Sequence, residues 1–421
     1  MQRRQRFLAA GSVVCLVAAL AACSDDANDQ QSTDTATTPA TTVADTVDTV
    51  PATTADVAPA TTEVTETTEK TTEVTETTEV PDTTEVPETT AAAQPAAWNS
   101  FQLDDCQCSD GSEVTFFQRD ADPTKVVLYF EGGGACFSLE TCDPNGDPTY
   151  SMTSPDSGGF LTNRGGLFDF ENAENPLTDH SFIYVPYCTG DVHSGDATTE
   201  YGEGVDGEDV VIEHRGFPNG MAALDHLVSE YPEIEQLVVT GASAGSVPTP
   251  LFAGLASDLL PDADIVTFGD SSGAYPDVPA LNAGIGALWG TMNAVPDWPA
   301  TADVTPETWS LPGMYVYAGL HAPNVRFGRF DYAFDETQSA FSALAGIPAD
   351  ELVTLIDGTE QMAEDAGVSV AKYVAAGDEH TIIGSDELYE METEGVRLID
   401  WITELITGEN APADIHCEIC T

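Results

Sequence analysis

The chain has 421 residues, of which 42% are hydrophobic, so it can bury a sizeable core and wholesale disorder is excluded. It carries 72 acidic and 12 basic residues, for a formal net charge of −60. Sixteen of the acidic residues and four of the basic ones precede residue 97, which leaves residues 97–421 with a net charge of −48. Such a field repels polyanions and argues against a nucleic-acid partner. This negative net charge is compatible with a protein from a saline habitat or with an ordinary acidic exported protein.

Residues 1–22 are predicted to be a lipoprotein signal peptide. Three arginines among the first six residues precede an apolar run, 7–22, that is short for a membrane span. Leu-Ala-Ala-Cys at 20–23 matches the bacterial lipoprotein box, in which the thiol of Cys23 takes the lipid. An uncleaved helical anchor is the alternative, and Arg3-Arg4 leaves twin-arginine export open beside the general route. We therefore expect an extracytoplasmic protein of the cell envelope, bound to the membrane through its lipid anchor only.

Residues 23–96 are predicted to be the lipidated cysteine followed by a disordered tether. They are mostly Thr, Glu, Ala, Val and Pro, and Thr-Thr-Glu-Val-Thr-Glu-Thr-Thr-Glu occurs at both 61–69 and 71–79. A segment of this composition cannot bury enough apolar surface to offset the entropy cost of ordering it. The tether would hold one folded domain, residues 97–421, away from the membrane.

Within residues 97–421, short β-branched runs alternate with longer helical patterns. The predicted strands are 125–130, 181–187, 236–240, 264–268, 314–317 and 369–374, 325–330 is a candidate strand, and the predicted helices are 220–231, 246–260 and 387–406. Strand–helix alternation predicts an α/β fold with a mainly parallel central sheet flanked by helices. Ligands of such sheets bind beyond the carboxyl ends of the strands. Because we find no second linker, we expect one domain with loop insertions.

Seven cysteines follow residue 97: Cys106, Cys108, Cys136, Cys142, Cys188, Cys417 and Cys420. Export predicts that they form disulfides, and Cys136 and Cys142 close a short loop, which makes them the best candidate pair. The two cysteines near the start of the domain could meet the two near its end, which would leave Cys188 unpaired. A zinc site formed by those four cysteines is a rarer alternative, and we otherwise predict no metal.

A sharp turn with a serine at its centre is predicted at Gly241-Ala242-Ser243-Ala244-Gly245. It follows a predicted strand and precedes a predicted helix, which is the context that a nucleophile elbow needs. The strained backbone at the serine tolerates only very small neighbours, and each flanking residue here is Gly or Ala. We therefore predict that Ser243 is a nucleophile, with a structural turn serine as the alternative.

An elbow of this kind also needs an oxyanion hole. The N–H of Ala244 would lie at a helix N-terminus, where the dipole favours negative charge. A second donor should come from a loop after an earlier strand, and the glycine-rich loop 131–135 follows the predicted strand 125–130. A plain glycine turn is one alternative. A phosphate-binding loop is disfavoured, because no lysine follows.

In an α/β-hydrolase the acid and then the histidine follow the serine along the chain. His380 lies in a loop between the last predicted strand and the last predicted helix, so it is the predicted base, with a solvated loop histidine as the alternative. Asp335, Asp331 and Asp270 each follow a predicted or candidate strand and could be the acid. Position favours Asp335 without deciding the matter. We expect the two carboxylates that are not used to be solvated surface acids.

These motifs together resemble the pectin acetylesterase family, which includes Notum-like serine hydrolases. The motifs that carry the resemblance run in order: Cys-Ser-Asp-Gly-Ser at 108–112, Glu-Gly-Gly-Gly-Ala-Cys at 131–136 with Cys142, Tyr-Cys-x-Gly at 187–190 with Ser-Gly-Asp at 194–196, the serine turn, and Phe-Asp-Glu-Thr-Gln at 334–338. They span roughly residues 106–405. Two departures are Ala135 in place of a family Trp, and Glu379 in place of a family Cys before the histidine.

The resemblance implies an α/β-hydrolase fold with Ser243, Asp335 and His380 as its triad. It places the oxyanion donors at Gly133, Gly134 and Ala244, and it implies neither a metal nor an organic cofactor. The departure at Ala135 leaves the shape of the acyl pocket open.

The predicted function is a carboxylic ester hydrolase that removes O-acetyl or other small acyl groups from a polysaccharide or related ester. Because the domain is so acidic, an acylated glycan with little charge, or another small ester, is expected rather than a polyuronate. A Notum-like lipid or protein deacylase and a non-catalytic ligand-binding lipoprotein are the alternatives. We expect a monomer.

Overall fold

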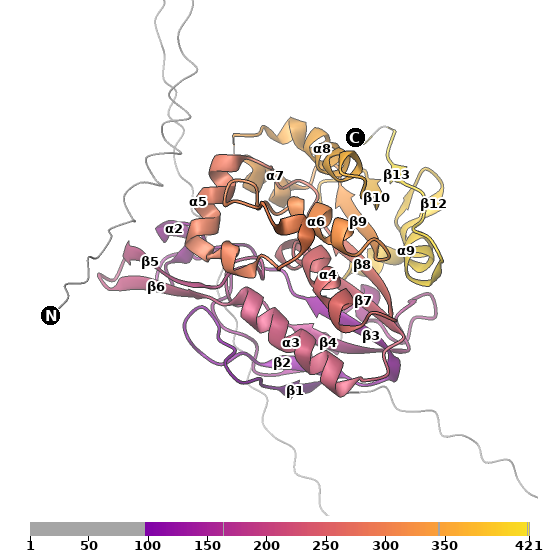
Figure 1. Ribbon diagram of the computed structural model, residues 1–421, viewed down its shortest axis with the longest axis horizontal. Coiled ribbons are helices and arrows are strands. Elements are labelled where there is room, and N and C mark those ends of the chain that lie inside the picture. The colour runs from indigo at the N-terminus through magenta and orange to yellow at the C-terminus, as the bar shows by residue number, and fades with distance from the viewer. Residues whose placement is uncertain (1–96, 163, 344–345, 419, 421) are drawn as a thin grey trace, which may run out of the picture. The chain divides into compact units, whose positions relative to one another are not determined.

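The structure is a computed structural model that describes residues 97–421 except 163, 344–345, 419 and 421 (Figure 1). The predicted signal peptide, the lipidation site at Cys23 and the tether lie outside the described residues. Among the helices of the described part, none combines the length and the apolar character that a membrane span requires.

A nine-stranded sheet forms the centre of the described part. Its strands are β1 (Asn99–Phe101), β2 (Phe116–Arg119), β3 (Asp122–Phe130), β4 (His180–Val185), β7 (Gln236–Ala242), β8 (Asp264–Asp270), β9 (Arg326–Tyr332), β10 (Val370–Ala375) and β13 (Ile415–His416). They lie in the order β1-β2-β4-β3-β7-β8-β9-β10-β13. The pairings β1–β2 and β2–β4 are antiparallel and the others are parallel, as the sequence predicts for a mainly parallel sheet.

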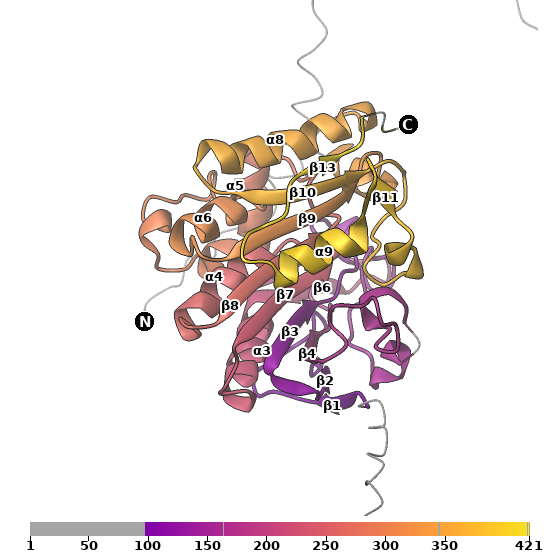
Figure 2. The same ribbon diagram turned by 90° about the vertical axis from the view of Figure 1, so that its right-hand side faces the viewer.

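Helices cover both faces of this sheet because its strands alternate their side chains between two apolar cores. In β3, Val126 and Leu128 face one core, and Val127 and Tyr129 face the other. The first core is covered by α3 (Gly216–Glu230), α4 (Thr249–Leu259) and α6 (Gly313–His321), and the second by α9 (Leu398–Thr407), which Figure 2 shows lying across the strands.

The other elements are short insertions and connections around these layers. They are α2 (Leu139–Cys142), α5 (Pro279–Trp289), α7 (Glu336–Ala343), α8 (Leu352–Asp365), the hairpins β5 (Ala197–Glu203)–β6 (Asp209–His214) and β11 (Glu392–Thr393)–β12 (Val396–Arg397), and several 3₁₀ turns.

Two predicted elements differ from the structure. Residues 314–317, predicted as a strand, lie in α6, where Met314, Tyr315 and Ala318 are buried on the side that packs against the sheet core. Packing on α4 therefore outweighs the β propensity of the aromatic residues. The predicted helix 387–406 begins only at Leu398, because Glu394 and Gly395, both with positive φ, turn the chain between β11 and β12.

The disulfide predicted between Cys136 and Cys142 is present, and the other pairings differ from the prediction. Cys108 pairs with Cys188, Cys417 pairs with Cys420, and Cys106 is the free cysteine among the described residues. The expected disulfides between the two ends of the domain are absent among the described residues. Cys108 lies between β1 and β2 along the chain, at one edge of the sheet, whereas Cys417 follows β13, which is the strand at the opposite edge. The alternative four-cysteine zinc site fails for the same reason.

Candidate active site

Ser243 lies at the turn that the sequence predicts, directly after β7. It begins a 3₁₀ turn, Ser243–Gly245, and its φ of 54° is in the left-handed region that non-glycine residues rarely adopt. A Cβ atom added to Gly245 would collide with the carbonyl oxygens of Phe130 and Glu131, so only glycine fits there. The turn is therefore packed tightly against the loop that follows β3.

That loop, Glu131–Cys136, lies beside the serine and is called the oxyanion loop below. A Cβ atom added to Gly132 would lie only 2.9 Å from the Cβ atom of Ser243. The φ values of Gly133 and Gly134 are 155° and 84°, and neither residue's N–H donates a hydrogen bond within the described part of the chain. Two backbone donors of the loop that lies beside the serine therefore have no partner among the described residues.

His380 and Asp335 form a hydrogen-bonded pair, although 45 residues separate them. The distance between His380 Nδ1 and Asp335 Oδ2 is 2.7 Å, and the aspartate is buried while the His380 side chain is 23% exposed. Because a carboxylate only accepts hydrogen bonds, Nδ1 carries the hydrogen and Nε2 of the neutral ring keeps its lone pair. His380 Nε2 is buried and has no hydrogen-bond partner among the described residues.

Gln338 fixes the position of the Asp335 carboxylate. The backbone N–H of Gln338 donates to Oδ1 at 2.8 Å, and its side-chain amide donates to Oδ2 at 3.1 Å. Both donors come from the first turn of α7, which begins directly after Asp335. The carboxylate that contacts His380 is thus held in one orientation.

Asp270 and Asp331 are fully buried, so the expectation that the unused acids are solvated is wrong. Asp270 ends β8, and its Oδ2 accepts hydrogen bonds from the N–H groups of Ile382 (2.9 Å) and Ile383 (2.8 Å), just after His380. Burial raises the pKa of Asp270 to about 6. Asp270 therefore anchors the histidine loop, a role that its position in the sequence did not reveal.

Asp331 has a different set of partners. It accepts hydrogen bonds from Arg329 Nε at 2.8 Å, from the N–H of Gly273 at 2.8 Å, and from the Gln338 amide at 3.0 Å. Burial raises its pKa as well. These contacts tie β9 to the loop after β8, and Asp335 rather than Asp331 contacts His380.

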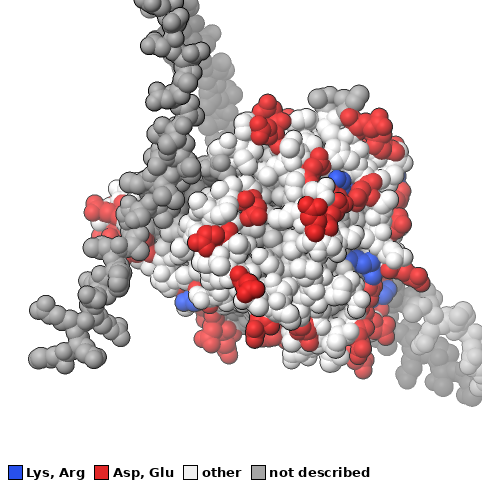
Figure 3. Space-filling model, turned by 45° about the horizontal axis from the view of Figure 1, so that its top comes forward, with Lys and Arg blue, Asp and Glu red and all other residues white. Residues whose placement is uncertain are grey.

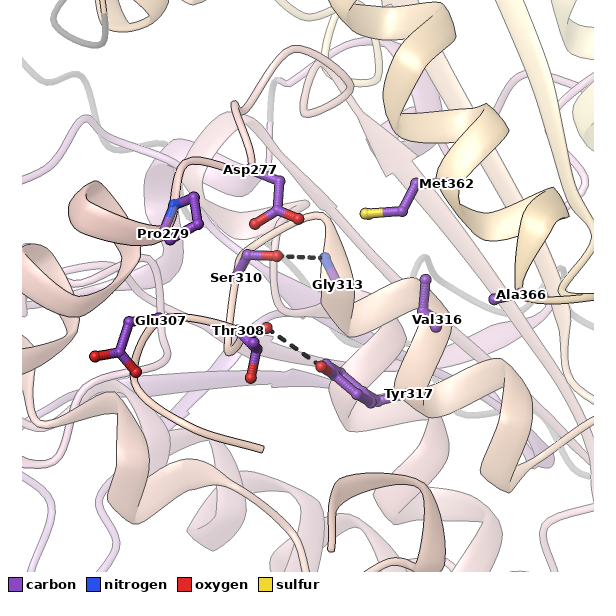
Figure 4. A pocket seen from close by; sticks show the side chains of 10 residues that line it. All are labelled: Asp277, Pro279, Glu307, Thr308, Ser310, Gly313, Val316, Tyr317, Met362 and Ala366. Atoms are coloured by element: carbon purple, nitrogen blue, oxygen red, sulfur yellow. Dashed lines mark hydrogen bonds between the residues drawn. The ribbon is translucent and has the colours of Figure 1, made fainter. Parts of the chain in front are cut away.

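Two pockets of the described part lie away from these residues. One pocket, of about 350 Å³, lies between α6, α8 and the loop that precedes α5. Asp277, Glu307 and Tyr317 are among the residues on its wall (Figure 4). The other, of about 530 Å³, lies beside the β5–β6 hairpin. Neither pocket is lined by Ser243, Asp335 or His380, so neither describes the acyl site.

Comparison with known proteins agrees with these motifs. Residues 91–287 match the family model described as pectinacetylesterase. This match covers the serine turn and the oxyanion loop, whereas Asp335 and His380 lie beyond it.

Curated proteins that this chain is similar to include the palmitoleoyl-protein carboxylesterase NOTUM of Schmidtea mediterranea. The two are 24% identical over 151 residues, which is 34% of this chain and 26% of that protein. The inactive palmitoleoyl-protein carboxylesterase notum1b of Danio rerio is 30% identical over 90 residues, 21% of this chain and 65% of that protein. The chain spans less than a third of the length of the first relatives it matches.

Among solved structures, the Wnt deacylase Notum from Drosophila has a TM-score of 0.58 and 17% sequence identity. The match covers 78% of this chain and 97% of that one. The fold of the described residues is therefore α/β-hydrolase-like, as predicted.

Proposed function

We propose that the chain is a serine carboxylesterase in which Ser243 is the nucleophile, His380 the base and Asp335 the acid that orients it. The observation that carries this proposal is the 2.7 Å hydrogen bond from His380 Nδ1 to the buried Asp335, which leaves Nε2 as a free acceptor. The loops that carry these three residues follow the parallel strands β7, β9 and β10. They therefore all lie at the carboxyl ends of the strands.

In the first half of the reaction, Ser243 Oγ attacks the carbonyl carbon of the ester and its proton passes to His380 Nε2. The carbonyl oxygen becomes an oxyanion, which accepts hydrogen bonds from the N–H groups of Gly133, Gly134 and Ala244. Asp335 stabilises the imidazolium. The tetrahedral intermediate then breaks its bond to the alcohol oxygen, and the alcohol leaves with the proton from His380.

In the second half, water attacks the acyl group on Ser243. His380 takes a proton from the water, the same N–H groups hold the second oxyanion, and the acid is released as Ser243 regains its proton. The chain's own residues account for every proton transfer in this scheme.

The substrate that we propose is an O-acetyl or other small acyl ester of a polysaccharide with little charge. The −48 charge of residues 97–421 supports this choice. Six of the eight basic residues of this region have a carboxylate oxygen within 4.0 Å: Lys125, Arg215, Arg326, Arg329, Lys372 and Arg397. On the face in Figure 3, acidic side chains far outnumber basic ones, so a polyuronate would be repelled at low salt.

A lipid or protein deacylase is the second candidate, because the curated relatives named above are palmitoleoyl-protein carboxylesterases. A non-catalytic binding protein is the third, since one of those relatives is named as inactive. For each candidate we propose the same location, the cell envelope, with the lipid on Cys23 as the membrane anchor. The apolar run before Cys23 and the lipoprotein box support that location.

Hydrolysis of p-nitrophenyl esters from acetyl to palmitoyl by the full chain separates these candidates. The variant Ser243→Ala should lower kcat by a factor on the order of 10⁶. Ser257→Ala is the matched control, because that serine lies on α4 and only donates a hydrogen bond to the carbonyl of Gly254.

A rate that falls steeply beyond butyryl supports removal of small acyl groups. A rate that holds or rises with chain length replaces that proposal with lipid deacylation. If no ester shows turnover that depends on Ser243, the chain is a binding protein and the esterase proposal is rejected.

A further inference from the structure

The oxyanion loop is held by a second segment, Tyr187–His193, that the catalytic scheme does not use. The hydroxyl of Tyr187 donates to the carbonyl of Gly134 at 2.9 Å. His193 Nε2 lies 2.8 Å from the carbonyl oxygen of Glu131, and it must be the donor because a carbonyl only accepts. In addition, the backbone N–H of Tyr187 donates to the Glu131 carboxylate at 2.9 Å, so the two segments are joined at both ends of the glycine run.

These contacts fix the first and last of four consecutive peptide units in the glycine run. The N–H groups of the two middle units remain free to bind a ligand. The His193 bond fixes the peptide unit between Glu131 and Gly132, and the Tyr187 bond fixes the unit between Gly134 and Ala135. The units in between carry the N–H groups of Gly133 and Gly134, which have no partner among the described residues. Consecutive glycines have little intrinsic preference for one orientation of these groups, so something else must set it.

We propose that Tyr187 and His193 are positioning residues that preorganise the oxyanion hole. This inference rests on the proposed function, and it adds two residues that act through Gly133 and Gly134 without touching the substrate.

The packing of the tyrosine supports this role. A Cβ atom added to Gly133 would lie 3.0 Å from Tyr187 Cδ1, so the ring also limits how that glycine can move. The Tyr187 hydroxyl accepts a hydrogen bond from the N–H of Val192 at 2.9 Å, which sets the direction of its own hydrogen. The rings of Tyr187 and His193 lie 4.8 Å apart, and both side chains are buried. The two donors therefore form one packed unit.

Neither donor changes its protonation near neutral pH. Burial raises the pKa of the Tyr187 phenol well above its ordinary value, so it stays protonated. Burial lowers the pKa of His193 to about 4, so its ring is neutral and carries one hydrogen, on Nε2. The orientation of the loop should accordingly be insensitive to pH near neutrality.

The variant Tyr187→Phe tests the inference because it removes the hydroxyl and keeps the ring. We expect kcat on the best ester to fall about tenfold or more, with KM within about twofold. The affinity for a trifluoromethyl ketone with the same alkyl chain should fall by the same factor as kcat/KM. Ser243 Oγ adds to that ketone, its proton passes to His380, and the resulting oxyanion occupies the hole.

Two further measurements separate positioning from stability. Tyr373→Phe is the matched control, because the hydroxyl of that buried tyrosine donates to the carbonyl of Val396, away from the oxyanion loop. It should keep kcat and the ketone affinity, whatever its melting temperature. At His193, Gln can place a donor near the position of Nε2 and Leu cannot, so His193→Gln should retain more ketone affinity than His193→Leu.

The inference is overturned if Tyr187→Phe keeps both kcat and the ketone affinity within twofold, or if kcat falls while the ketone affinity does not. If Tyr187→Phe does not fold, the two His193 variants decide, and equal ketone affinity in both overturns it. Failure of the proposed function is a different result, because the unaltered chain would then show no turnover that depends on Ser243.

Discussion

The oxyanion loop and the loop that carries His380 are held in place by different chemistry. The oxyanion loop ends at a disulfide, Cys136–Cys142, and receives hydrogen bonds from neutral donors. The histidine loop is held by carboxylates: Asp335 binds the ring of His380, and Asp270 binds the backbone just after it. The loop that must bind a developing negative charge thus receives hydrogen bonds from neutral donors. The loop that must carry a positive imidazolium instead donates hydrogen bonds to carboxylates. The two supports should therefore fail under different treatments.

The largest expected effect is at Asp335. Asp335→Asn should lower kcat by a factor on the order of 10⁴, because an amide can donate to Nδ1 and stabilise the wrong tautomer of His380. The asparagine oxygen can still accept the N–H of Gln338, so the fold should persist. Steady-state kinetics on the best ester, with the melting temperature as a check, measures this effect.

The control for Asp335→Asn is Asp378→Asn, which removes one exposed negative charge two residues before His380. It should keep kcat within about twofold, because solvent screens the effect of one exposed charge. Comparable losses in both variants would mean that general charge, and not the hydrogen bond to Nδ1, supports the base.

The next largest effect concerns Asp270, the anchor of the histidine loop. Asp270→Ala leaves the buried N–H groups of Ile382 and Ile383 without an acceptor and should lower the free energy of unfolding by about 3–5 kcal/mol. Asp270→Asn keeps an oxygen that can accept both bonds and should lose much less. Urea unfolding together with kcat checks this order, and an alanine variant with unchanged kcat would show that the loop needs no anchor.

Loss of the disulfides near the oxyanion loop should lower the free energy of unfolding. Cys108–Cys188 links residues 80 apart and Cys136–Cys142 links residues 6 apart. On the chain-entropy model, replacing each pair by serine costs about 4.5 and about 2 kcal/mol respectively. Urea unfolding of the two double variants measures both costs. A smaller loss for the long link would indicate that the unfolded chain keeps its ends close together.

Local sequence patterns were enough to predict the serine turn and the histidine loop. Ser243 could be found because an elbow demands small residues on both sides within five positions. His380 could be found from the order of elements along the chain. Asp335 was different, because three carboxylates followed strands, and position favoured Asp335 only weakly until the family resemblance was added. The structure then brought Asp335, and not its rivals, against His380.

Long-range contacts explain what the sequence did not show. The partners of Asp270 are backbone N–H groups more than 110 residues away, and no side-chain pattern marks them. Tyr187 was visible only as a member of a resembling motif and His193 was not singled out at all, since their acceptors are carbonyl groups of the oxyanion loop. The disulfide of Cys108 was assigned wrongly because nearness to a chain end says nothing about which edge of the sheet a residue occupies.

The smallest expected effect is a pH dependence of stability that arises from a feature common to the two loops. Each loop has a buried aspartate behind it. Asp191 accepts hydrogen bonds from the N–H groups of His193 and Gly216, behind the oxyanion loop, and Asp270 lies behind the histidine loop. Burial raises the pKa of each carboxyl from 3.8 to about 6. The folded state therefore holds these protons more tightly than the unfolded state, and the stability that each aspartate contributes falls as the pH rises through this window.

Linkage gives a loss of about 1 kcal/mol per aspartate between pH 5 and pH 6. Repulsion among the many surface carboxylates has the same sign, but salt screens it, whereas the buried groups are screened much less. Burial lowers the pKa of His193 and His214 to about 4, which gives a change of opposite sign in the same window, so each aspartate is read from the difference between its variant and the unaltered chain. By urea unfolding in about 1 M salt, Asp191→Asn and Asp270→Asn should each shift the change in stability between pH 5 and pH 6 by about 1 kcal/mol toward higher stability at pH 6. If only Asp270→Asn does so, then the oxyanion side has no titrating support, and the contrast between the two loops is complete.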